Sequence, residues 1–303
     1  MQEPMLNAIS VDVEDFFHVE AFASCVSRTD WDSFSPRVEK NVARVLELFA
    51  RYNTLGTFYV LGWVAQRFPQ LVRQIERAGH EIGCHGFSHQ HIGRQTPGIF
   101  RLDIREARNR LMDEVQKPVV CYRAPSFSIT SNTLWALEVL VEEGFKIDSS
   151  IFPVKHDLYG MPDAPRFPYW RQTSGHSAIF EFPPSTVQLG NFNLGVGGGG
   201  YFRLIPYFIS KRALRYINKK EYKPAMVYFH PWEIDPDQPR IPAKLRSRLR
   251  HYTNLSTMES KIEQLLRDFR FTTVTRTAEQ LEDYCTSAPG SALFDEGTQK
   301  SCA

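Results

Sequence analysis

Short apolar runs alternate with helical patterns from the start of this 303-residue chain almost to its end. This alternation is typical of parallel strands joined by crossover helices, and it predicts an α/β fold. We expect strands at residues 6–13, 57–61, 80–84, 119–122, 145–147, 180–182, 225–229 and 271–274, and helices near 38–49, 69–78, 97–116, 133–143, 206–219, 258–269 and 278–284.

The number of strands favours a closed barrel. An open doubly wound sheet fits the alternation as well, but a dinucleotide-binding sheet of that kind carries a glycine-rich turn after its first strand. Residues 12–15 stand in that place and read Asp-Val-Glu-Asp. We therefore expect a single distorted (β/α)7-type barrel, with two long loops near residues 150–176 and 185–204. The second loop contains the glycine-rich run 195–200, which lacks the Lys and Ser/Thr of a phosphate loop and predicts a flexible segment.

The composition is that of a globular protein that can bury its own core. Hydrophobic residues make up 42% and charged residues 23% of the chain. A chain of this size removes about 75% of its unfolded surface from water, so it needs no disulfide framework or structural metal. Lys and Arg number 36 against 34 Asp and Glu, without a basic block. This balance does not indicate nucleic acid as a partner.

The cysteines and the first residues favour a cytoplasmic location. Five widely spaced cysteines with no Cys-x-x-Cys pair disfavour a disulfide scaffold or a thiolate zinc site. The N-terminus has no basic segment, and its apolar stretch reaches Asp12 too soon for a signal peptide. No apolar run approaches the roughly 18–20 residues of a membrane span.

Polar side chains follow the apolar runs at the points where the strands should end. In a (β/α) barrel the carboxyl ends of the strands converge on one face, where the active site lies. We expect such a site to be formed by Asp12, Glu14, Asp15, His85, His89, Arg123, Asp148 and His230.

His85 and His89 are candidate metal ligands. On a helical turn, residues four apart lie on one side, which suits a divalent ion, although His91 offers an alternative. Gly86 stands where the His-Glu-x-x-His motif of metalloproteases needs Glu. A carboxylate from residues 12–15 would complete a site of two histidines and one carboxylate, with open positions for water and substrate.

Acid–base chemistry is expected from the first and the seventh strand. Asp12 and Glu14 lie two residues apart, so on a strand both point to one face while Asp15 points away. One of the two would bind metal and the other would act as a base; alternatively, the acidic cluster caps the following segment. His230 at a strand end suits a general acid with a carboxylate neighbour, or else a buried core histidine.

Five short motifs in this chain resemble those of the polysaccharide deacetylase family, also called the NodB-homology or carbohydrate esterase family 4 domain. The resemblance covers about residues 6–274 and implies one catalytic domain over residues 1–285, followed by a disordered tail at 286–303. The motifs occur in the family's order at Ser10–Asp15, His85–His89, Arg123–Phe127, Asp148–Ser150 and Tyr228–His230.

The resemblance also implies a ligand set for a divalent cofactor. Zinc or a similar ion would bind to Glu14, His85 and His89, with Asp15 as the alternative carboxylate.

Four further residues receive roles from the same resemblance. Asp12 would take a proton from water, and His230 would protonate the departing amine. Arg123 would orient Asp12, and Asp148 would hold His230 in its protonated form.

The implied activity is that of a polysaccharide N-deacetylase, a hydrolase of carbon–nitrogen bonds other than peptide bonds. The substrate would be an N-acetylhexosamine-containing polysaccharide or its precursor, because the chain is similar to a bacterial subgroup found with exopolysaccharide synthesis and exosortase systems. Two alternatives remain open. One is a same-fold amidohydrolase acting on small cyclic amides, and the other is a non-catalytic sugar-binding protein.

Overall fold

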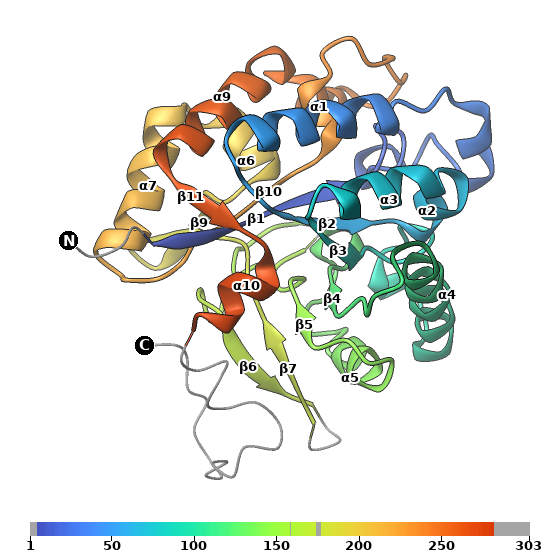
Figure 1. The fold of residues 1–303 in the computed structure, drawn as a ribbon, viewed down its shortest axis with the longest axis horizontal. Helices are drawn as coiled ribbons and strands as arrows, with labels where there is room; N and C mark the ends of the chain where they lie inside the picture. Colours follow the sequence, from blue (N-terminus) through green and yellow to red (C-terminus); the bar gives the residue numbers. More distant parts are fainter. Residues whose placement is uncertain (1–4, 158, 174–176, 282–303) are drawn as a thin grey trace.

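The computed structural model describes residues 5–157, 159–173 and 177–281. The tail expected at 286–303 lies outside the described residues. Figure 1 shows a central, mostly parallel sheet surrounded by helices, which confirms the predicted α/β class. No helix in the described part of the chain is long and apolar enough to cross a membrane.

The sheet follows the order β10-β1-β2-β3-β4-β5-β7-β6, and all pairs along it are parallel except β6–β7. A ninth strand, β11, pairs with the start of β1. Parallel strands covered on both faces are buried along their whole length, as residues 7–13 of β1 are, although Asn7, Ser10 and Asp12 among them are polar. The bounds are β1 Leu6–Val13, β2 Thr57–Val60, β3 Glu81–Cys84, β4 Cys121–Tyr122, β5 Ile147–Asp148, β6 Tyr169–Gln172, β7 Ala178–Glu181, β10 Met226–Phe229 and β11 Arg270–Thr272.

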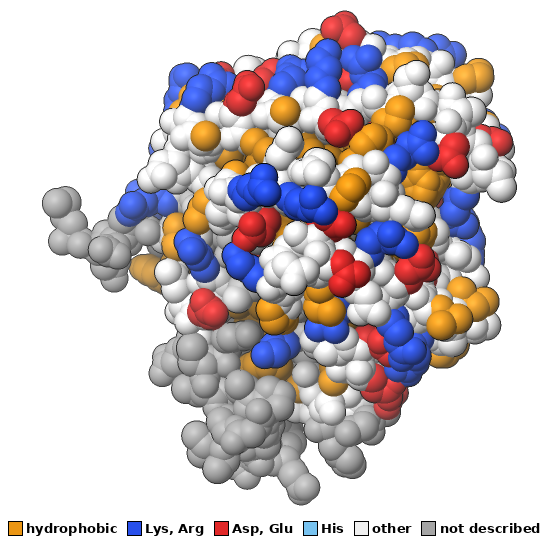
Figure 2. Space-filling model, turned by 45° about the vertical axis from the view of Figure 1, so that its right-hand side comes forward, with side chains coloured by type: hydrophobic (Ala, Val, Ile, Leu, Met, Phe, Trp, Pro, Cys, Tyr) orange, Lys and Arg blue, Asp and Glu red, His pale blue; other side chains and the backbone are white. Residues whose placement is uncertain are grey.

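Helices pack around this sheet, and neighbouring helices are joined by ion pairs at their exposed edges. Figure 1 shows α1 and α9 side by side, where Arg44 bonds Glu259 at 2.6 Å. Figure 2 shows basic and acidic side chains interspersed on the face it draws. The helices are α1 Val38–Arg51, α2 Gly62–Arg67, α3 Pro69–Arg77, α4 Pro97–Val115, α5 Trp135–Glu142, α6 Gly199–Leu204, α7 Tyr207–Lys219, α8 Leu245–Tyr252, α9 Leu255–Asp268 and α10 Val274–Glu279.

All eight predicted strands are present, although several are shorter than expected. The two predicted long loops contain regular structure that the alternation did not indicate, namely β6, α6 and a hairpin of β8 (Thr186–Leu189) with β9 (Phe192–Gly195). A two-residue Gly190-Asn191 turn joins the hairpin, and Gly190 has a φ of 59°. Such a turn is a recognised hairpin signal.

No pair of strands closes the sheet into a barrel within the described residues; irregular backbone lies against β10 instead. The Ser185 N–H donates to the Met226 carbonyl at 3.2 Å, and the Tyr228 N–H donates to the Gly197 carbonyl at 2.7 Å. A Cβ atom added at Gly197 or Gly198 would lie only 2.3 or 2.0 Å from a β10 carbonyl oxygen. Gly197 and Gly198 are therefore packed closely against β10, so the prediction of a flexible segment is wrong for this part of the glycine run.

Candidate active site

Three buried side chains from two strand ends form a candidate metal site. Glu14 follows β1, His85 follows β3, and His89 lies in the loop after His85. Their potential ligand atoms all lie within 4.8 Å of one another. The strand-end argument thus places this carboxylate with both histidines.

The loop that carries the histidines is not the helical turn that their spacing suggested. Gly86 and His89 have positive φ angles of 74° and 49°, which break a right-handed helix. Asp103 of α4 holds the loop, because its carboxylate accepts hydrogen bonds from Phe87 N at 2.8 Å and from Ser88 N and Oγ at 3.2 and 2.6 Å. Asp103 was not identified from the sequence, since its contacts depend on how α4 packs.

The protonation and hydrogen bonding of these side chains fit a divalent ion. The His85 Nδ1 lies 2.8 Å from the Arg123 carbonyl, which can only accept, so Nδ1 carries the proton and Nε2 keeps its lone pair. Burial lowers the pKa of His85 to about 4 and keeps the ring neutral. The Glu14 Oε2 is buried 2.8 Å from His89 Nε2, yet no partner meets it with hydrogen-bond geometry. An orphaned carboxylate oxygen beside imidazole nitrogens suits a zinc-type ligand set.

Asp15, the alternative candidate for the metal-binding carboxylate, instead binds backbone N–H groups. Its side chain accepts hydrogen bonds from the backbone N–H groups of Phe16 at 2.9 Å, Arg37 at 2.5 Å and Val38 at 2.9 Å. It therefore caps the start of α1. Burial raises the pKa of Asp15 to about 6, against the effect of these three hydrogen bonds. The capping alternative thus describes Asp15, while Glu14 turns toward the histidines.

Asp12 is fixed by a buried arginine. Arg123 Nη1 donates to Asp12 Oδ1 at 2.6 Å, as the expected orienting role requires. The same guanidinium donates to Ser10 Oγ and Ser149 Oγ at 2.8 Å each, so its own position is well determined. The other Asp12 oxygen, Oδ2, is 3.8 Å from His230 Nε2. Arg123 therefore leaves one oxygen of Asp12 directed toward the site.

His230 lies between the metal group and the surface. Its Nε2 is 3.5 Å from Glu14 Oε1 and 3.8 Å from Asp12 Oδ2, and its side chain is 19% exposed. Burial lowers the pKa of His230, but the carboxylates of Glu14, Glu233 and Asp12 outweigh burial and raise it to about 9. These carboxylates thus favour the protonated imidazole, which is the form that a proton donor needs.

The carboxylate that partners His230 is Glu233. Its Oε2 accepts from the His230 backbone N–H at 3.0 Å and lies 3.1 Å from His230 Nδ1. The short 3-10 turn Pro231–Ile234 folds Glu233 back over the histidine. Arg203 donates to the other oxygen, Oε1, at 2.5 Å. Glu233 was not identified from the sequence, although the spacing His-x-x-Glu resembles that of a capping box, in which the Glu side chain returns to the first backbone N–H.

Asp148 does not hold His230, so this expectation is corrected. Asp148 accepts a hydrogen bond from Ser150 Oγ at 2.5 Å and faces Glu181, its register partner across β5 and β7. Burial raises the pKa of both carboxyl groups. The reason is the order of the sheet, in which β5 lies beside β7 and four strands, β1 to β4, separate it from β10.

Two family models match this chain. Residues 30–141 match the polysaccharide deacetylase model, and residues 149–279 match a domain of unknown function, DUF3473. Among curated proteins, a peptidoglycan deacetylase of Helicobacter pylori is 29% identical over 113 residues, which are 37% of this chain and 38% of that protein. A peptidoglycan-N-acetylglucosamine deacetylase of Bacillus cereus is 33% identical over 99 residues, 31% of this chain and 35% of that protein. The matches thus span little more than a third of these relatives.

Solved structures share the fold over a greater length. A "putative polysaccharide deacetylase" from Mycobacterium smegmatis superposes with a TM-score of 0.59 at 19% identity, covering 98% of each chain. Puue allantoinase superposes with a TM-score of 0.58 at 16% identity, and the match covers 90% of this chain and 88% of that one. A carbohydrate esterase family 4 pseudoenzyme from Bacillus anthracis superposes with a TM-score of 0.50 at 10% identity. The match covers 91% of this chain and 66% of that one. Proteins of different activity share this fold, so function must be argued from the site.

Proposed function

We propose that this chain, whose residues 30–141 match the polysaccharide deacetylase model, is a metal-dependent hydrolase that removes N-acetyl groups from an N-acetylhexosamine-containing glycan. The observation that carries the proposal is the convergence of Glu14, His85 and His89 beside Asp12 and His230. A ligand set, a base and an acid then stand within a few ångströms. This complete set favours a catalyst over a non-catalytic sugar-binding protein.

Glu14, His85 and His89 would hold the divalent ion, for which we propose zinc. Such an ion polarises a carbonyl and increases the acidity of a bound water. The Arg123 carbonyl on His85 Nδ1 directs the free nitrogen of that ring toward the ion. The contact with the Arg123 carbonyl therefore fixes both the orientation of the His85 ring and the tautomer that metal binding requires.

The remaining residues would move protons. Asp12 Oδ2 takes a proton from the attacking water, while Arg123 donates to Oδ1 and holds the carboxylate in place. His230 donates a proton to the nitrogen of the departing amine as the C–N bond breaks. Glu233, held by Arg203, stabilises the protonated ring and fixes its orientation. The products are acetate and a free amino sugar.

The test is acetate release from N-acetylglucosamine oligomers by the full chain, before and after treatment with a chelator. We expect activity that is lost on chelation and restored by zinc. His230→Ala should abolish release without changing the metal content. Acetate release that persisted both after chelation and in His230→Ala would contradict the proposal.

The natural substrate is proposed to be an exopolysaccharide or its precursor. Support comes from the Ser-Val-Asp-Val-Glu-Asp opening and the His-Pro-Trp-Glu segment, which resemble the exopolysaccharide-associated subgroup. The relatives named above are peptidoglycan deacetylases, so peptidoglycan is the competing substrate to measure. Faster release from peptidoglycan than from a partially acetylated exopolysaccharide would reject this assignment.

A cytoplasmic location is also a proposal. Within the described residues, Cys84 and Cys121 are buried free thiols, and Cys25 is an exposed one. Free thiols persist in a reducing compartment. Cell fractionation with an antibody against the chain tests this location directly, and recovery outside the cytoplasmic fraction would reject it.

A further inference from the structure

The indole ring of Trp232 connects the proposed acid to the candidate metal site. Trp232 lies in the short 3-10 turn Pro231–Ile234, between His230 and Glu233. Its Nε1–H donates a hydrogen bond to Glu14 Oε1 at 3.2 Å. An indole nitrogen only donates and an ionised carboxylate only accepts, so the two groups match. One oxygen of the proposed metal ligand is therefore held by a neutral side chain from the turn that follows β10.

The two oxygens of Glu14 have different surroundings. Oε1 accepts from Trp232 and lies 3.5 Å from His230 Nε2. Oε2 lies 2.8 Å from His89 Nε2 and has no hydrogen-bond partner. A carboxylate with two free oxygens can bind an ion through both, as in many Ca²⁺ sites, whereas a four-coordinate zinc site commonly takes one atom from each ligand. The indole N–H thus leaves Oε2 as the oxygen that is available beside the histidines.

The plane of the indole ring is held by rings and by a cation. Trp232 stacks on His230, with ring centroids 5.1 Å apart and an interplanar angle of 22°. It also stacks on His251, at 4.1 Å and 15°. The guanidinium carbon of Arg203 lies 5.3 Å from the centroid of the indole ring, within the range of a cation–π contact. These contacts determine the direction in which the indole N–H points.

Gln238 joins the turn to the imidazole that stacks on the indole ring. Its Nε2 donates to the carbonyl oxygens of Trp232 at 2.8 Å and of Asp235 at 2.9 Å. This orientation of the amide leaves Oε1 2.6 Å from His251 Nε2, and because an amide oxygen only accepts, that nitrogen carries the proton. The turn, the indole ring and His251 are therefore held together by directional contacts as well as by packing.

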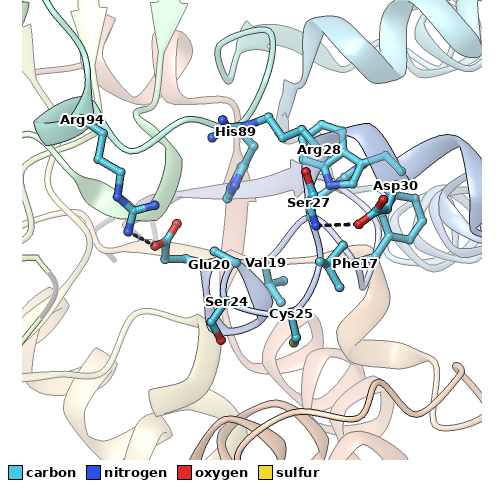
Figure 3. A pocket seen from close by; sticks show the side chains of 14 residues that line it. Phe17, Val19, Glu20, Ser24, Cys25, Ser27, Arg28, Asp30, His89 and Arg94 are labelled. Carbon is cyan, nitrogen blue, oxygen red and sulfur yellow. Dashed lines mark hydrogen bonds and ion pairs between the residues drawn. The ribbon is translucent and has the colours of Figure 1, made fainter.

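Trp232 does not line the cavity that adjoins the candidate metal site. Figure 3 shows side chains that line this cavity of about 460 Å³, among them Phe17, Glu20 and His89. Trp232 is absent from the lining, and it is only 5% exposed. Its influence on the site must therefore pass through Glu14 and His230 instead of through contact with a substrate.

We propose that Trp232 is a positioning residue for the metal: its indole N–H holds Glu14 Oε1 and so presents Oε2 to a divalent ion, while its ring supports the His230 imidazole. This inference rests on the proposed function and deepens it, because it assigns the group that sets how the carboxylate binds. The competing explanation is that Trp232 only fills the buried aromatic cluster that also contains Phe16 and Trp31. The experiments must separate the hydrogen bond from the packing.

The first experiment compares zinc affinities by competition with a zinc-binding dye. Trp232→Phe removes the N–H and keeps an aromatic ring. Trp31→Phe is the matched control, because Trp31 belongs to the same cluster and is also 5% exposed, but its ring contacts His18 and Trp63.

We expect both variants to lose thermal stability without metal, and Trp232→Phe alone to bind zinc about 10- to 100-fold more weakly. Native zinc affinity in Trp232→Phe, or an equal loss of affinity in both variants, would overturn the inference.

The second experiment observes the indole N–H in the native protein. The chain has five tryptophans, so ¹⁵N-tryptophan labelling gives a simple set of indole signals. When zinc is added to the chelator-treated protein, the Trp232 signal should shift most, because the ion withdraws charge from the carboxylate that accepts its hydrogen bond. Phe variants of the other tryptophans assign the spectrum even if Trp232→Phe does not fold. A Trp232 signal that zinc left unchanged would overturn the inference.

These measurements need no turnover, so they separate this inference from the proposed function. If no glycan releases acetate but zinc affinity depends on the Trp232 indole, the proposed function fails and the positioning role stands. If acetate is released in a zinc-dependent reaction but Trp232→Phe binds zinc like the native protein, the positioning role fails and the proposed function stands.

Discussion

His230 Nδ1 lies 3.1 Å from the carboxylate of Glu233, a residue only three positions further along the chain. A local turn therefore supplies the partner that orients the proposed acid. Arg203, from helix α6, which begins within the glycine run, holds the second oxygen of Glu233. His230 is thus oriented by a buried chain of charges that does not include Asp148.

Glu233→Gln should lower kcat about ten- to a hundredfold, part of the gain that a well-placed acid supplies. The carboxamide cannot balance the charge of the protonated ring, whereas Asp148→Asn leaves the environment of His230 unchanged and should keep kcat within about twofold of native. Initial rates of acetate release give both values. Because Glu233→Gln leaves Arg203 buried without its carboxylate, circular dichroism must first show a native fold. A greater loss in Asp148→Asn than in Glu233→Gln would contradict the assignment.

Asp12→Asn and Glu14→Gln should separate proton transfer from metal binding. Asp12→Asn removes the base and should lower kcat about 10²- to 10⁴-fold with the metal content unchanged. Glu14→Gln removes a charged ligand, so it should lower both metal content and activity. Elemental analysis of the purified variants, combined with acetate release, distinguishes the two effects. Loss of metal from Asp12→Asn but not from Glu14→Gln would exchange the roles of the two carboxylates.

Asp103→Ala should weaken metal binding about 10- to 100-fold, the usual loss when a residue behind the ligands is removed. Asp103 touches no ligand side chain; it holds the backbone of Phe87 and Ser88, and without it the loop no longer brings His89 toward Glu14. Competition with a zinc-binding dye measures the affinity. Asp113→Ala, near the far end of the same helix, is the control. Equal affinities in the two variants would refute this role.

Ionisation of the buried Glu181 carboxyl group should lower the free energy of unfolding as pH rises. Burial raises the pKa of Glu181 and of Asp148, and Asp148 raises that of Glu181 further, so the folded state binds protons more tightly than the unfolded chain. The resulting stabilisation is complete below the unfolded pKa of about 4 and is lost as pH rises through the elevated folded values.

Glu181→Gln imitates the protonated form of that side chain and should remove much of this pH dependence. Urea unfolding at pH 5 and pH 8 gives the free energies of both proteins. We expect the variant to gain stability relative to the native protein between pH 5 and pH 8. A native advantage that grew with pH would refute the assignment.

Gly198→Ala should destabilise the fold by about 1–3 kcal/mol, the usual cost of overpacking. Its φ is 152°, and an added Cβ would lie 2.0 Å from the Tyr228 carbonyl oxygen. Gly200→Ala is the matched control, because a Cβ there meets no atom within 4 Å. Thermal unfolding of both variants measures the difference. Equal stabilities would show that the glycine run is not packed against β10 as described.

The strand-end residues were predictable because apolar runs define the strands and parallel strands end on one face. Asp12, His85, His89, Arg123 and His230 could be assigned to one site on this ground alone. The packing of α4 could not be predicted, since the contacts of Asp103 with the Phe87 and Ser88 backbone do not depend on local periodicity.

The sequence by itself determined the class of fold, the succession of the strands along the chain and most of the polar groups at their ends. Only the tertiary structure decided between neighbouring carboxylates, selecting Glu14 over Asp15 as the companion of the histidines and Glu233 over Asp148 as the partner of His230. The physical reason is that a strand's period determines side-chain direction only while the strand continues. Beyond its last residue, direction depends on turns and caps, whose partners come from distant parts of the chain.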